Sequence, residues 1–271
     1  MSLRARLDAF LFAPVDARIA DLFRAGLALM LVPVFWPRAM LVQEWVIAFP
    51  GAESFYRSVY LTPPWLALTL LALALFALGW RVRWMALVLA LLLLPSLFMQ
   101  GYGKSRQVLY VAMLAISLLR CDFCFGLFSR DSDTRGSAGG PIWPVRLVQL
   151  QLSLLYFVNA AAKTTPDYLS GQVLIDMSRL YPNFKIDLST GFLEIGPLAI
   201  PAWLCAVGTV LVEFALALGF WFQRTRIASA ILGVTFHGSL KFIVRIGWLD
   251  WASMFLYLSF LLPFESRDPE R

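Results

Sequence analysis

Two uninterrupted apolar segments constrain this fold more than any other feature. Trp65–Trp80 and Trp84–Met99 consist largely of Leu, Ala and other apolar residues, and only Arg81-Val82-Arg83 separates them. Their length approaches the thickness of a bilayer core, and Leu and Ala favour helix over the short alternating strands of a membrane barrel. Because 60% of the chain is hydrophobic and only 15% is charged, an ordinary soluble domain is a poor fit. The sequence predicts an all-α polytopic transmembrane helical bundle.

About eight spans follow from the distribution of the apolar segments. The basic residues, which give a net charge of +6, are spread over the span ends, so no nucleic acid is expected as a partner. Lys and Arg are more frequent on the side of the N-terminus, so we expect a multi-pass protein of the cell inner (cytoplasmic) membrane with a cytoplasmic N-terminus. Residues 1–271 are expected to form one transmembrane domain with no soluble C-terminal domain. The expected spans lie near residues 19–36, 65–80, 84–99, 106–120, 146–163, 201–222, 227–244 and 249–264.

Five ionisable residues interrupt these spans: Arg24, Lys163, Glu213, His237 and Lys241. Each costs ~3 kcal/mol at the bilayer centre, and such residues usually face the bundle interior or a wet cavity. Glu213 has two interpretations, a structural partner of Arg24 or Lys163, or a functional acid. His237 is the only histidine, and a lone histidine is more often a satisfied core residue than a ligand. No second histidine or acidic cluster accompanies it, so no metal site is expected.

Lys163 ends a polar stripe on one predicted helix. Steps of seven, three and four residues place Gln149, Tyr156, Asn159 and Lys163 on the same face. One interpretation is a lysine whose long side chain reaches from the helix end to the membrane interface. The other is a desolvated, neutral amine that serves as a base. Spacing alone leaves both open.

Cys121 and Cys124 form a Cys-Asp-Phe-Cys sequence that permits a redox pair. The expected topology places them on the reducing cytoplasmic side, where packing at a span end is the alternative. The sequence leaves their redox activity open.

The segment from Tyr156 to Gly171 resembles a known family. Tyr156-Phe157, Lys163, Asp167-Tyr168 and Gly171 match, without gaps, the residues around the base lysine of the vitamin K-dependent γ-carboxylase, with Tyr168 in place of a tryptophan. The resemblance continues through Trp143, Gln151, Pro14, Asp16, Phe23-Arg24, Glu213, Arg226, Phe236-His237 and Ile246-Gly247. It covers most of the chain, as in the horizontally transferred transmembrane (HTTM) superfamily.

This resemblance implies a membrane enzyme with Lys163 as the catalytic base. The implied cofactor is vitamin K hydroquinone or another quinol, which the lysine deprotonates at the extracytoplasmic side. Tyr156, Asn159, Glu213, His237, Arg24 and Arg106 are the expected pocket residues. Membrane lipid is an expected partner, and a secreted peptide precursor or a small molecule is the expected substrate.

Two departures separate this chain from the carboxylases that it resembles. The stretch Lys104–Tyr110 lacks the family's histidine, and Arg106 stands near its position. The large region that captures the carboxylase substrate is also not seen after the last span. The sequence therefore leaves open whether glutamate carboxylation survives. A non-catalytic component of secreted-peptide (toxin) maturation, which some short members of the superfamily resemble, is the alternative function.

Overall fold

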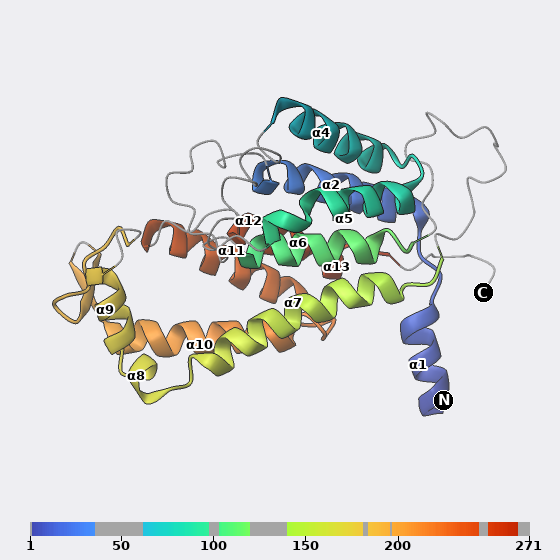
Figure 1. Ribbon diagram of the computed structural model, residues 1–271. Coiled ribbons are helices and arrows are strands. Elements are labelled where there is room, and N and C mark those ends of the chain that lie inside the picture. Colours follow the sequence, from blue (N-terminus) through green and yellow to red (C-terminus); the bar gives the residue numbers. More distant parts are fainter. Residues whose placement is uncertain are drawn as a thin grey trace. The chain divides into compact units, whose positions relative to one another are not determined.

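The computed structural model is mainly helical, with a two-stranded hairpin among the residues that it describes (Figure 1). The described residues are 2–35, 62–97, 103–119, 140–180, 184–195, 197–243 and 249–264. The chain divides into two compact units. The first unit contains Met1–Gln149 and Leu262–Arg271, and the second contains Leu150–Leu261.

The helices of the first unit pack in neighbouring pairs. Helix α2 contacts α4 and α6, and α5 contacts the same two helices. Pro63 and Pro64 occupy the first turn of α4, where proline costs no hydrogen bond, and Gly79 ends that helix with a φ of 84°. The helices are α1 (Leu3–Phe12), α2 (Ala17–Phe35), α4 (Pro63–Leu78), α5 (Val82–Leu97), α6 (Gly103–Ile116) and the beginning of α7 (Trp143–Ala162).

Segments far apart in the sequence meet within the first unit. The backbone N–H of Ile142 donates to the carbonyl of Ala13 at 2.9 Å, and the N–H of Asp16 donates to the carbonyl of Phe264 at 2.7 Å. The rings of Phe23 and Phe264 make an edge contact at 5.5 Å between centroids. These contacts join the residues before α2, the residue before α7 and Phe264 within the first unit.

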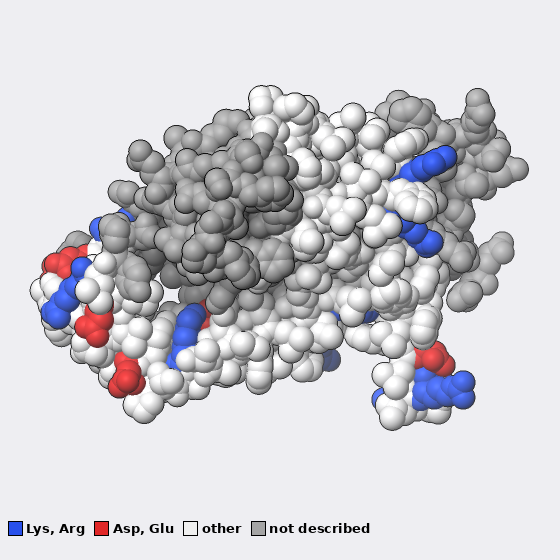
Figure 2. Space-filling model, in the orientation of Figure 1, with Lys and Arg blue, Asp and Glu red and all other residues white. Residues whose placement is uncertain are grey.

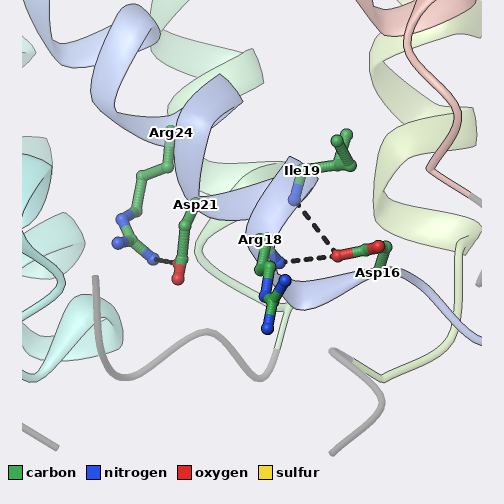
Figure 3. Close-up of polar contacts among 5 residues, drawn as sticks. All are labelled: Asp16, Arg18, Ile19, Asp21 and Arg24. Carbon is green, nitrogen blue, oxygen red and sulfur yellow. Dashed lines mark hydrogen bonds and ion pairs between the residues drawn. The ribbon is translucent and has the colours of Figure 1, made fainter. Parts of the chain in front are cut away.

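Two carboxylates organise the first turns of α2 (Figure 3). Asp16 Oδ1 accepts hydrogen bonds from the backbone N–H groups of Arg18 at 2.8 Å and Ile19 at 3.4 Å, which satisfies donors at the helix start. One turn later, the fully buried Arg24 donates through Nη1 to Asp21 Oδ1 at 2.5 Å. The Asp21 carboxylate thus compensates a buried positive charge.

In the second unit, side chains join α7 to α10. Trp221 Nε1 donates to Ser153 Oγ at 2.8 Å, and Phe157 meets Phe214 edge to face at 5.6 Å. Helix α10 also packs on α11, and α11 packs on α12. The elements of this unit are the remainder of α7, α8 (Pro166–Leu169), α9 (Gln172–Leu180), β1 (Phe192–Ile195), β2 (Leu198–Pro201), α10 (Ala202–Gly219), α11 (Arg226–Ile243), α12 (Leu249–Leu256) and α13 (Leu258–Leu261).

The connection between α7 and α10 carries its own secondary structure. Thr165 caps α8 by accepting from the N–H of Tyr168, and β1 and β2 pair antiparallel with Leu193 opposite Ile200. The N–H of Lys185 donates to the carbonyl of Ile243 at 2.8 Å, which satisfies an acceptor at the end of α11. Charged side chains of this unit gather over α8 and α9, whereas the visible face of α7 is nearly uncharged (Figure 2).

Each of the eight expected spans coincides with a helical segment, although the last is divided between α12 and α13. Among the described residues, α7 and α10 are the two helices that are both long and apolar enough to cross a membrane. Shorter apolar helical segments of 10–17 residues lie at Pro63–Leu78, Val82–Leu94, Gln107–Ile116 and Trp251–Leu261. The all-α prediction is therefore confirmed in its main feature, and the number of spans stays a prediction. The β-hairpin was not predicted.

Candidate functional site

Lys163 meets Glu213 where α7 ends. Its Nζ donates to Glu213 Oε1 at 2.6 Å; Lys163 directly follows α7, and Glu213 lies on α10 of the same unit. Helix α7 stops at Ala162 because Lys163 and the following threonines precede Pro166, which begins α8. A cation at this position also interacts favourably with the carbonyl end of the helix.

The two partners of this ion pair differ in exposure. The Lys163 side chain is 29% exposed, whereas the Glu213 side chain is 7% exposed. Glu213 Oε2 is buried and has no hydrogen-bond partner among the described residues. A buried carboxylate normally has both oxygens satisfied, so this atom is a ready acceptor for a donor from a ligand.

Tyr168 lies beside the pair from α8. Lys163 Nζ is 5.9 Å from the centroid of its ring, which is within the range of a cation–π contact. Burial and the nearby Glu213 carboxylate raise the pKa of Tyr168 to about 12, although a hydrogen bond with Thr209 lowers it in part. The phenol therefore stays protonated at neutral pH and can act as a hydrogen-bond donor.

A second polar cluster lies within the same unit. The hydroxyl of Tyr156 is 2.7 Å from His237 Nε2 and 2.5 Å from the hydroxyl of Tyr257. All three side chains are buried, and they come from α7, α11 and the residue that follows α12. Lys163 is seven residues after Tyr156, a separation of about 10 Å along a helix. The pairing of Tyr156 with His237 joins two of the residues that the sequence predicted for the pocket.

The remaining predicted residues lie as follows. Asn159 is half-buried on α7 between Tyr156 and Lys163. Arg24 belongs to the first unit, where its partner is Asp21, so the structure selects Lys163 as the partner of Glu213. Arg106 is a residue of α6 whose side chain lies outside the described part, as do Cys121 and Cys124. Among the described residues, no group of three or more His, Cys, Asp or Glu side chains could hold a metal ion.

Tyr257 and Thr209 were not predicted as site residues from the sequence. The signal for Tyr257 was present, because Ser253 and Tyr257 are four residues apart in an otherwise apolar segment and therefore share a helix face. Thr209 and Glu213 are related in the same way on α10. Their partners on other helices could not be read from spacing.

Comparison with known protein families identifies the family of this chain. The HTTM domain pattern matches residues 14–263, which include all the site residues described above. The chain belongs to the HTTM family. This HTTM protein is therefore a membrane protein, and the family membership expected from the Tyr156–Gly171 segment is confirmed. No curated protein and no solved structure matches the chain.

Proposed function

We propose that this HTTM protein is an integral membrane enzyme in which Lys163 acts as a general base on a lipid-soluble quinol. The base acts at the extracytoplasmic side of the cytoplasmic membrane, and the N-terminus is cytoplasmic. The product of this chemistry is a modified peptide or small substrate. The observation that carries the proposal is the 2.6 Å contact between the partly exposed Lys163 amine and the buried Glu213 carboxylate.

Lys163 can act as a base only in its neutral amine form. Glu213 Oε1 positions Nζ at 2.6 Å, and this carboxylate stabilises the ammonium that forms when Nζ takes a proton.

The residues present fit a hydroxyl-bearing ligand. Lys163 Nζ is accessible to accept a proton, and Glu213 Oε2 can accept a further hydrogen bond. Apolar side chains such as Phe157 and Leu211 are exposed on α7 and α10, which is compatible with entry from lipid. A bound quinol would supply the acidic hydroxyl and two reducing electrons. Lys163 would hold the proton at Nζ, and Glu213 would stabilise the resulting ammonium through Oε1.

Glutamate carboxylation is not part of this proposal. The stretch Lys104–Tyr110 lacks the histidine of the carboxylases that it resembles. Lys163 deprotonates the quinol, and the reducing power of the quinol is used on a peptide or small substrate.

Quinol consumption by matched variants tests the role of Lys163. Lys163→Ala removes the amine, and Lys163→Arg replaces it with a guanidinium that stays charged. We expect the rate of quinol consumption to fall at least about 100-fold in both variants, which is the lower end of the range for loss of a general base. Lys241→Ala is the matched control, because Lys241 lies over the ring of Trp251 in the same unit. The assay uses membranes supplied with reduced quinone and oxygen. Consumption at the parent rate by both Lys163 variants would contradict the proposal and favour a role in peptide maturation.

A further inference from the structure

The Tyr156 hydroxyl is the middle member of a buried chain of three polar groups. It lies 2.7 Å from His237 Nε2 on one side and 2.5 Å from the Tyr257 hydroxyl on the other. Tyr156 is 3% exposed, His237 is 6% exposed and Tyr257 is 1% exposed. All three belong to the second unit. The chain therefore joins three helical segments through groups that can each both donate and accept.

The chemistry of these groups allows two directions of hydrogen bonding. A phenol has one proton, so Tyr156 can donate to His237 and accept from Tyr257, or accept from His237 and donate to Tyr257. Both directions are compatible with the same positions of the heavy atoms. We infer that Tyr257, Tyr156 and His237 form a proton relay through the second unit, with Gly233 as the residue that positions the Tyr257 hydroxyl.

One transfer along the relay is balanced as follows. A proton from solvent water reaches the Tyr257 oxygen, Tyr257 passes its own proton to Tyr156, and Tyr156 passes its proton to His237 Nε2. The imidazole then releases the proton of Nδ1 to solvent water. Only O–H and N–H bonds form and break, and no redox partner is required. Reversal of each step carries a proton the other way.

Gly233 permits the position of the Tyr257 ring. A Cβ on Gly233 would lie 2.5 Å from the Tyr257 hydroxyl oxygen and 2.7 Å from both Cε2 and Cζ. The ring of Phe220 packs on the same tyrosine, with 4.8 Å between centroids. Gly233 is one helical turn before His237 on α11, so one helix both positions the first hydroxyl and supplies the last group of the relay.

An obligatory structural network predicts a different response from a relay. In that alternative, the three groups only satisfy one another's hydrogen bonds, and removing one hydroxyl loosens the site. Exchange of the buried imidazole proton with solvent then becomes faster or stays unchanged. In a relay, removing a hydroxyl removes the route for the proton, and exchange becomes slower.

The single histidine makes this measurement specific. Histidine labelled with ¹⁵N reports His237 alone in the full-length protein, provided that purification uses a tag without histidine. The experiment follows exchange of the ring N–H with D2O in lipid bilayers by NMR. The variants are Tyr257→Phe, Tyr156→Phe and Gly233→Ala. Gly238→Ala is the control on the same helix, because a Cβ there meets nothing within 4 Å among the described residues.

We expect exchange about tenfold slower in Tyr257→Phe, Tyr156→Phe and Gly233→Ala, and an unchanged rate in Gly238→Ala. Tenfold corresponds to ~1.4 kcal/mol of barrier, about the net value of one hydrogen bond. Faster or unchanged exchange in Tyr257→Phe would overturn the relay. If Gly233→Ala does not fold, the exchange rate of Tyr257→Phe tests the relay by itself. Because the readout is independent of quinol turnover, it can succeed or fail regardless of the role of Lys163.

Discussion

Replacement of Gly171 by alanine tests the close contact between the connection that follows α7 and the first residues of α10. Gly171 has a φ of +83°, which is unfavourable for alanine. A Cβ there would also lie 2.5 Å from the backbone N of Trp203 and 2.6 Å from the carbonyl C of Ala202. Both atoms belong to the first residues of a helix and cannot move independently of it. Gly171→Ala should therefore be destabilising for two separate reasons.

Gly191 allows the two contributions to be separated. It has the same φ of +83°, but a Cβ at Gly191 meets nothing within 4 Å among the described residues. Gly191→Ala should cost about 1 kcal/mol from backbone conformation alone. The steric overlap at Gly171 should add about 2 kcal/mol, the middle of the range for overpacking. The total for Gly171→Ala is thus about 3 kcal/mol, which corresponds to a fall in Tm of about 6–12 °C.

Thermal unfolding of the two variants in identical lipid nanodiscs, followed by tryptophan fluorescence, measures this difference. The expected order of Tm is parent, then Gly191→Ala, then Gly171→Ala. Equal losses in the two variants would refute the close approach of the connection to α10. Such a result would also weaken the placement of Tyr168 beside Lys163, because Gly171 directly follows the segment that carries this tyrosine.

Two further predictions concern ionisable groups. Burial raises the pKa of Tyr168 to about 12, so the contribution of this phenol to the free energy of unfolding is fully present below pH 10 and is lost as the pH rises from 10 to 12. Tyr168→Phe should therefore lose less stability than the parent between pH 10 and 12. The variant should also lack the step in tyrosinate absorbance near pH 12. Asp21→Asn removes the carboxylate partner of buried Arg24, so it should lower the free energy of unfolding by about 3 kcal/mol in a denaturation assay. The double replacement of Asp21 by Leu and Arg24 by Met removes both charges, so it should recover most of this loss. A double variant as unstable as Asp21→Asn would contradict this account.

The sequence by itself determined the class of protein and the positions of most helices. The high share of apolar residues argues against an ordinary soluble domain, and each expected span coincides with a helical segment. Ionisable residues within these spans also identified Lys163, Glu213 and His237 as residues with a special environment. These inferences depend on local composition and helical periodicity, which a sequence contains in full.

Only the tertiary structure decided which of these residues meet. Glu213 pairs with Lys163, 50 positions away, rather than with Arg24, and Tyr156 contacts His237 and Tyr257 at separations of 81 and 101 positions. Helical spacing assigns a side chain to a face of its own helix, but it does not specify which face of another helix packs against it. That choice depends on close contacts between helices. A polar side chain on an apolar helix must find a partner, but the packing of the whole unit determines which partner lies within reach.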